Sequence, residues 1–338
     1  MRAFNLFLLF LLSNALLTAQ STIQLPQQPL EGPGGSTYIL DSVVMEDFAE
    51  FQDGYWLFRP DKIPTAHNSL VVFNHGYGAF NPMIYGAWIK HIVRQGNIIV
   101  FPRYQKNLVS PKPKKFTNNA AIGIKSAILH LREKGWLVKE DFHLSIVAHS
   151  YGGVVSAGLA NDYKEYGIPK PQAIMLCSPG TGPLKGGLLS SYESIEIDTK
   201  LLTLISVNDK TVGEKFGRHV FKTSPQLTHS NLLRQFPDRN GDAKITAGHN
   251  ECYGVDRQFD TGLYNRSTRR ALRIEKVDPM DYLGYWKLFD ALRSCSQNGT
   301  DCNIALGGTE EQASIGEYSD GKKIRPLKVY TNIDELEE

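Results

Sequence analysis

Apolar runs alternate with helical spacing through the middle of the chain. Runs rich in Val, Ile, Leu and Phe occupy Leu70–His75, Asn97–Phe101, Phe142–Ala148, Ala173–Cys177 and Leu201–Val207. Segments with apolar residues at helical spacing lie between them, from Met83 to Gln95 and from about Asn119 to Lys134. Apolar strands separated by helices are typical of a parallel sheet that is covered on both faces. The pattern therefore predicts an α/β fold with a mostly parallel central sheet and helices on both faces.

The two ends of the chain depart from this alternation. Thr37–Val44 and Tyr55–Phe58 are rich in aromatic and β-branched residues, which predicts antiparallel opening strands. Asp281–Leu292 is a late amphipathic segment. Residues 301–338 carry no motif and end in acidic residues, so we expect a surface extension there. The length allows one large domain, which we place at 37–300 after a lead-in segment at 20–36.

Residues 1–19 have the pattern of a signal peptide. Arg2 supplies a positive charge, Leu6–Leu12 is an unbroken apolar run, and Leu17-Thr-Ala19 is an acceptable cleavage site. The run is too short to span a bilayer, and no later segment approaches the roughly 20 apolar residues that a spanning helix needs. We therefore expect a secreted or periplasmic protein without an integral membrane segment after cleavage. An uncleaved membrane anchor is the alternative.

The charge of the chain does not point to a nucleic-acid partner. The 37 Lys and Arg residues nearly balance the 35 Asp and Glu residues. No electrostatic attraction to nucleic acid or to an acidic membrane surface is therefore expected. The basic cluster Lys112–Lys115 lies in a predicted loop, where a solvated surface is the simplest explanation.

The chain has four cysteines, and an exported protein can form disulfides. Cys295 and Cys302 bracket a segment that contains Asn298-Gly299, a turn that can bring the two ends together, so we predict a disulfide between them. Cys177 ends an apolar run and is expected to be a small buried hydrophobic residue. No second cysteine–histidine pair accompanies Cys252, which disfavours a zinc site, and whether Cys252 is paired stays open.

Ser150 stands at an abrupt turn between an apolar run and a segment of small residues. The pattern Ala148-His149-Ser150-Tyr151-Gly152 matches a G-x-S-x-G elbow with alanine at its first position. Such a turn exposes the serine hydroxyl at the sheet edge, where a base can activate it as a nucleophile. The stretch resembles the elbow of the serine α/β-hydrolases, in which Ala-x-Ser-x-Gly is a known variant. A serine without function in a tight turn is the alternative.

His75-Gly76-Tyr77-Gly78 follows the first long apolar run. A tetrahedral acyl intermediate needs N–H donors from the residue after the nucleophile and from the loop after the third strand of this fold. Tyr151 and Tyr77 hold those two positions. The stretch resembles the His-Gly oxyanion loop of esterases, lipases, dienelactone hydrolases and cutinase-like polyester hydrolases. The resemblance implies an oxyanion hole formed by the amides of Tyr77 and Tyr151, and a simple turn is the alternative.

In this superfamily the acid and then the histidine follow the serine along the chain. Asp209 comes at the end of a predicted strand, where the family keeps a carboxylate that orients the imidazole. An Asn-Asp turn cap is the alternative for this residue. Two histidines are candidates for the base: His249 follows the plausible last strand, Asn231–Phe236, whereas His229 precedes it. We predict a triad of Ser150, Asp209 and His249.

A possible calcium loop lies between that strand and His249. Asp238, Asn240 and Asp242 have the required spacing. However, Ala243 replaces the expected glycine, and His249 stands where the bidentate glutamate is expected. A surface turn is the favoured interpretation, and calcium binding by these residues stays open.

These residues and resemblances predict a secreted serine hydrolase of the α/β-hydrolase fold, of the carboxylesterase or lipase type. It would cleave a small-molecule or polymeric carboxylic ester through an acyl-enzyme on Ser150, without a cofactor. Two alternatives remain: a member of the same fold that cleaves amides or peptides, and a non-catalytic binding protein. Acyl and alcohol specificity and the oligomeric state do not follow from the sequence, because the fold hosts many activities.

Overall fold

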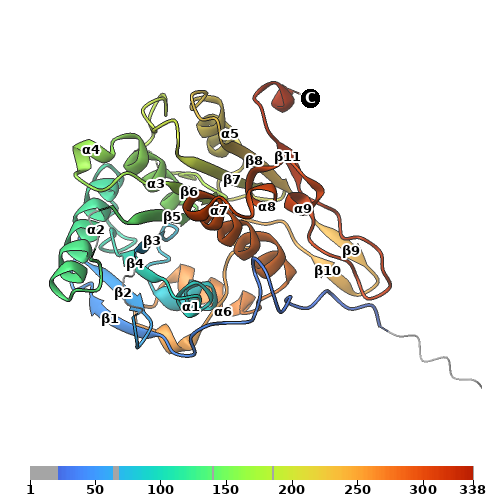
Figure 1. The fold of residues 1–338 in the computed structure, drawn as a ribbon, viewed down its shortest axis with the longest axis horizontal. Helices are drawn as coiled ribbons and strands as arrows, with labels where there is room; N and C mark the ends of the chain where they lie inside the picture. The colour runs from blue at the N-terminus through green and yellow to red at the C-terminus, as the bar shows by residue number, and fades with distance from the viewer. Residues whose placement is uncertain (1–21, 64–67, 139–140, 185, 338) are drawn as a thin grey trace, which may run out of the picture.

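A nine-stranded sheet forms the centre of the fold in the computed structural model, which describes residues 22–337 except 64–67, 139–140 and 185 (Figure 1). The predicted signal peptide, residues 1–19, lies outside the described residues. The sheet order is β1-β2-β4-β3-β5-β6-β7-β8-β11. The strands are β1 Val44–Phe48, β2 Tyr55–Arg59, β3 Ser69–Asn74, β4 Ile98–Pro102, β5 His143–His149, β6 Ala173–Cys177, β7 Lys200–Ser206, β8 Ser230–Gln235 and β11 Lys328–Tyr330. The strands from β4 to β8 are parallel, whereas β1, β2 and β11 are antiparallel to their neighbours.

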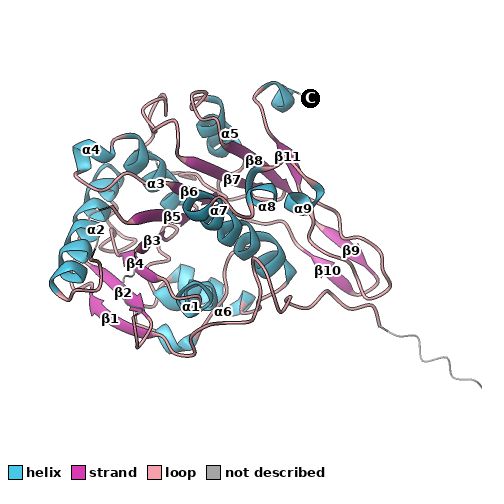
Figure 2. Cartoon of the chain, in the orientation of Figure 1, coloured by secondary structure: helices cyan, strands magenta, loops and turns pink. Residues whose placement is uncertain are grey.

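Helices cover both faces of this sheet (Figure 2). They are α1 Gly86–Arg94, α2 Phe116–Glu133, α3 Tyr151–Asn161, α4 Tyr163–Tyr166, α5 Lys215–Lys222, α6 Arg266–Ile274, α7 Lys287–Asn298, α8 Cys302–Leu306 and α9 Glu310–Ala313. Shorter elements are the 3₁₀ helices η1 Pro82–Tyr85, η2 Pro113–Lys115, η3 Arg257–Phe259 and η5 Asp334–Glu337, and the π-helix η4 Met280–Trp286. A separate hairpin joins β9 Asp238–Asn240 to β10 Ala243–Ile245. Within the described part of the chain, no helix has the length and apolar character needed to cross a membrane.

Strand β3 shows how the sequence pattern builds the two layers. Successive side chains of a strand point to opposite faces, so an apolar run supplies both cores. Val71 and Phe73 belong to the core that includes residues of α1 and α7. Leu70 and Val72 belong to the core that includes residues of α2 and α3. The predicted α/β fold with a mostly parallel sheet and helices on both faces is confirmed, and it is consistent with an α/β-hydrolase fold.

The first strand begins later than the sequence pattern predicts. The expected strand Thr37–Val44 is wrong, because β1 starts at Val44, and the segment before it bonds instead to α1, where Leu40 N–H donates to the Arg94 carbonyl. Strand β1 pairs with β2 from Val44, opposite Arg59, to Phe48, opposite Tyr55. Pro60 follows β2 and has no N–H to continue the ladder, so the pairing stops there.

The C-terminal segment also differs from the expected surface extension over 301–338. Its strand β11 pairs antiparallel with β8 and so becomes the last strand of the central sheet. Ile315, Tyr318 and Ile324 of this segment are buried in the same core as α7. An uncovered β8 would present a row of unpaired backbone groups, and β11 covers that edge.

Candidate active site

Ser150 lies between β5 and α3 in a strained backbone conformation. Its φ of 57° and ψ of −122° are rare for a residue with a side chain. The Ser150 carbonyl accepts hydrogen bonds from Gly153 N–H and Gly180 N–H, which hold this turn in place. At Gly152, an added Cβ would lie 2.2 Å from the carbonyl oxygen of Asn74. Glycine at this position therefore allows α3 to pack directly against the end of β3.

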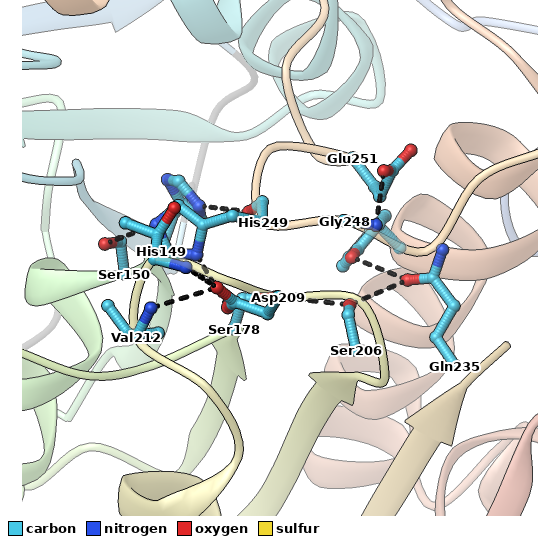
Figure 3. Close-up of polar contacts among 12 residues, drawn as sticks. His149, Ser150, Ser178, Ser206, Asp209, Val212, Gln235, Gly248, His249 and Glu251 are labelled. Atoms are coloured by element: carbon cyan, nitrogen blue, oxygen red, sulfur yellow. Dashed lines mark hydrogen bonds and ion pairs between the residues drawn. The ribbon is translucent and has the colours of Figure 1, made fainter. Parts of the chain in front are cut away.

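His249 connects this serine to a carboxylate (Figure 3). Its Nε2 lies 2.9 Å from Ser150 Oγ, and its Nδ1 lies 2.7 Å from Asp209 Oδ2. All three residues are nearly buried, with exposed fractions of 6% for Ser150, 8% for Asp209 and 9% for His249. The two outer residues of the predicted triad, Ser150 and Asp209, therefore each lie within hydrogen-bonding distance of His249. His229, the other candidate, is exposed and precedes β8.

Asp209 follows β7 and is held as an acceptor. Its Oδ1 accepts the N–H groups of Thr211 and Val212 at 2.8 and 3.0 Å, which leaves Oδ2 for His249. Burial acts to raise the pKa of Asp209, but the hydrogen bond and charge of His249 and the two backbone N–H groups outweigh it, so the pKa is lowered. The carboxylate therefore stays ionised and can hold the Nδ1–H tautomer of His249.

The loop that carries His249 is fixed by several hydrogen bonds. Glu251 accepts the N–H of Gly248 and the hydroxyl of Thr246, both at 2.6 Å. Gln235, the last residue of β8, donates from Nε2 to the Thr246 carbonyl at 2.6 Å. Because these contacts restrain the backbone on both sides of the turn, the imidazole is presented to Ser150 from a preorganised loop.

His149, the residue before Ser150, also contacts this loop, and its role was not predicted from the sequence. The Nε2 atom lies 2.8 Å from the His249 carbonyl oxygen, and Nδ1 lies 2.8 Å from the Tyr85 hydroxyl. Tyr85 in turn accepts the N–H of Gly76 at 2.9 Å. Burial, followed by the nearby His249, lowers the pKa of His149 to about 3. A neutral His149 with its proton on Nε2 donates to the His249 carbonyl and accepts the Tyr85 hydroxyl on Nδ1, so every group in this series of hydrogen bonds has a partner. The only sequence signal was the histidine inside the elbow motif.

The amides of Tyr77 and Tyr151 have no hydrogen-bond partner among the described residues. The rest of the Tyr77 loop is tied down: Gly78 N–H donates to Gln105 Oε1 at 2.7 Å, and its carbonyl accepts Asn265 Nδ2 at 2.7 Å. Ser267 Oγ donates to the Tyr77 carbonyl at 3.2 Å. Tyr77 and Tyr151 line the same cavity as Ser150, and two N–H groups without partners beside a serine are the arrangement that an oxyanion hole requires.

A cavity of about 190 Å³ opens beside Ser150 and His249. Both predicted oxyanion residues line it, together with Leu184, Val212, Tyr253 and Arg270. Its volume is below the roughly 300–1,000 Å³ of pockets that enclose drug-sized ligands. The site can therefore hold a short acyl group next to the serine.

The remaining predicted sites lie apart from this cavity. Asp238 Oδ2 accepts the N–H of Arg325, and Asn240 Nδ2 donates to Asp320, both at 2.8 Å, so both side chains bind the C-terminal segment. No group of three or more His, Cys, Asp or Glu side chains that could hold a metal ion occurs in the described ranges. Residues 238–245 form the β9–β10 hairpin, which agrees with the favoured surface turn.

The cysteines behave as predicted. The disulfide between Cys295 and Cys302 is confirmed, and it joins α7 to α8. Cys177 is buried in the core, as expected for a small hydrophobic residue. Cys252, whose state the sequence left open, is also buried and unpaired.

The sheet order and the elbow define an α/β fold that is consistent with that of the α/β-hydrolases. No protein-family model matches this chain, and no curated protein matches it.

Proposed function

We propose that this protein is a serine hydrolase that cleaves a carboxylic ester through an acyl-enzyme on Ser150. The observation that carries the proposal is the hydrogen-bond chain from Ser150 Oγ through His249 to Asp209, at 2.9 and 2.7 Å, on a strained strand-to-helix turn. A serine nucleophile needs a neighbouring base, and the base needs a group that fixes its tautomer. Both requirements are met within one connected set of side chains.

Acylation begins when Ser150 Oγ attacks the ester carbonyl carbon and its proton passes to His249 Nε2. Asp209 stabilises the imidazolium that forms, since its carboxylate accepts the Nδ1–H. The negative charge that develops on the carbonyl oxygen is bound by the amides of Tyr77 and Tyr151. His249 then gives the proton to the leaving alkoxide, the ester C–O bond breaks, and the acyl group remains on Ser150.

Deacylation repeats these steps with water. His249 takes a proton from a water molecule, whose oxygen attacks the acyl carbon, and the same two amides bind the second oxyanion. When the tetrahedral intermediate collapses, His249 returns the proton to Ser150 Oγ and the carboxylic acid leaves. These steps use no cofactor, and a short acyl group suits the small cavity.

We also propose that the protein acts outside the cytoplasm. The signal-peptide pattern of residues 1–19 motivates this location. The disulfide between Cys295 and Cys302 supports it, because such bonds persist in oxidising compartments.

A fluorophosphonate probe tests the proposed activity, since it reacts only with an activated serine. We expect labelling at Ser150, mapped by mass spectrometry, together with hydrolysis of short-chain esters. Ser150→Ala should lose both the label and the turnover while its circular dichroism spectrum stays the same. A label on another serine, or full activity in the variant, would contradict the assignment. A folded protein that takes no label and cleaves neither esters nor amides would favour the non-catalytic alternative.

A further inference from the structure

Helix α6 presents four arginines on one exposed face beside the candidate active site. Arg266, Arg269, Arg270 and Arg273 follow the spacing i, i+3, i+4 and i+7, which places them on one side of a helix. All four are exposed, and together they line a groove of about 480 Å³. At 1.5 Å per residue, the row extends over roughly 10 Å.

These arginines are unpaired within the described part of the chain. None of their guanidinium groups forms an ion pair or hydrogen bond with a described residue, whereas neighbouring Arg257 pairs with Glu275. Like charges at helical spacing oppose helix formation. Arg266 adds to this cost because a cation at the first position of a helix is unfavourable to the helix dipole. An anion bound across the row would relieve both effects.

The arginine groove lies next to the catalytic cavity, and the two have one lining residue in common. Arg270 lines both of them, and Ser267 of the same helix also lines the catalytic cavity. The start of α6 is fastened to the oxyanion loop, since Asn265 holds the Gly78 carbonyl and Ser267 holds the Tyr77 carbonyl. A molecule whose ester lies at Ser150 can therefore extend over α6.

The exposed face of α6 is not suited to insertion into a membrane surface. An interfacial helix inserts an apolar face between lipids. In α6 the inward side, with Ala271 and Leu272, already packs against the protein core, and the arginines occupy the outer face. A dissolved anion fits this surface better than a bilayer does.

We propose that α6 is an anion-binding subsite and that the substrate is an ester carrying carboxylate, sulfate or phosphate groups. The proposal rests on the proposed esterase function and adds the substrate class. The anionic part of the molecule lies along the arginine row while the ester carbonyl lies between Ser150 and the oxyanion amides. Guanidinium groups suit such partners because they donate two parallel hydrogen bonds to carboxylate, sulfate or phosphate oxygens.

Two pairs of matched esters test the subsite. The first pair is 4-acetoxybenzoate, whose alcohol part carries a negative charge, and its neutral partner 4-acetoxytoluene. The second pair is 4-nitrophenyl hydrogen glutarate, whose acyl part carries the negative charge, and its neutral partner 4-nitrophenyl pentanoate. The readout is the ratio of kcat/KM for the anionic ester to that for its neutral partner. We expect a ratio of about tenfold or more in at least one pair, falling as sodium chloride is raised, because exposed charges are screened by salt.

Three variants, each with several substitutions, show whether the arginines cause the preference for anionic esters. The charge-removing variant combines Arg266→Gln, Arg269→Gln, Arg270→Gln and Arg273→Gln. The charge-keeping variant places lysine at the same four positions. The control variant combines Lys112→Gln, Lys114→Gln and Lys115→Gln, which removes exposed positive charge elsewhere. The glutamine variant should bring the ratio near one, the lysine variant should keep part of it, and the control should retain the wild-type ratio.

A ratio near one for both pairs in the wild type, or an unchanged ratio in the glutamine variant, would overturn the proposal. Loss of binding to phosphatidylglycerol vesicles in the glutamine variant, with unchanged ester ratios, would assign α6 to membrane docking instead. Binding of 4-acetoxybenzoate and 4-acetoxytoluene to Ser150→Ala separates this proposal from the catalytic one. If the wild type cleaves no ester but Ser150→Ala still prefers the anion, only the catalytic proposal fails. Equal, arginine-independent binding of both compounds would refute the subsite.

Discussion

His149 donates its Nε2–H to the backbone carbonyl of His249, 2.8 Å away, and so joins the turn at Ser150 to the loop of the proposed base. Its other ring nitrogen accepts the Tyr85 hydroxyl, which itself accepts Gly76 N–H at the start of the oxyanion loop. One chain of hydrogen bonds therefore sets the relative positions of the elbow, the base and the oxyanion loop. Because these hydrogen bonds end on the backbone atoms of His249 and Gly76, we expect them to position the two loops and to take no part in proton transfer.

Tyr85→Phe should lower kcat by about tenfold and change KM little, because it leaves Gly76 N–H and His149 Nδ1 without their partner while the substrate cavity keeps its lining. Steady-state kinetics with a short ester measure this. Tyr38→Phe is the matched control, since the Tyr38 hydroxyl contacts His91 Nδ1 at 3.0 Å in a partly buried pair outside the candidate site. Equal kinetic losses in both variants would mean that the Tyr85 hydroxyl serves general stability alone.

Replacement of the two candidate histidines should have unequal effects. His249→Ala removes the group that contacts both Ser150 and Asp209, so kcat should fall by several orders of magnitude. His229→Ala changes an exposed side chain, and kcat should stay within about tenfold of the wild type. Turnover of a short ester by the two purified variants provides the comparison. The reverse order would rule out His249 as the base.

Removing the disulfide should destabilise the protein modestly. Cys295 and Cys302 are only seven positions apart, so the closed loop is short and the expected loss is about 2 kcal/mol or less. Urea unfolding of the double variant Cys295→Ser and Cys302→Ser measures this loss. Peptide mapping without reduction should recover the two cysteines in one linked peptide. Free thiols at both positions in the unreduced protein would refute the link.

Stability should fall as the pH is lowered through the range in which His143 stays neutral in the fold. Burial, and then the charges of Arg293 and Lys200, lower the pKa of His143 to about 4, against 6.5 for the free side chain. Between these two values the unfolded chain binds a proton that the folded chain excludes, so the free energy of unfolding decreases with falling pH. The contribution of His143 between pH 7 and 4.5 should be about 2–3 kcal/mol.

Urea unfolding of His143→Gln at both pH values tests this. The loss of stability between pH 7 and pH 4.5 should be smaller in the variant than in the wild type by that amount. His229→Gln, at an exposed position, is the control and should show the wild-type loss. An unchanged loss in His143→Gln would show that other groups account for the acid sensitivity.

The sequence alone determined the elements whose signals are local. The apolar run Ala173–Cys177 became β6 with the same bounds, and the disulfide followed from two cysteines around a turn. The elbow and the order of Ser150, Asp209 and His249 identified three residues that the fold places in contact. Periodicity, turn residues and motif order lie within short windows or along the chain, so a single sequence can display them.

Only the tertiary structure decided the contacts between distant segments. His149 and His249 are 100 positions apart, and Ser267 reaches Tyr77 across 190 positions. Strand β11 joins β8 although nothing in its own sequence predicts a strand of the central sheet. Such contacts depend on the register of the sheet and on which loops become neighbours. Packing of the whole core determines both. For the same reason, only the fold places α6 beside the cavity at Ser150, which Arg270 of this helix lines.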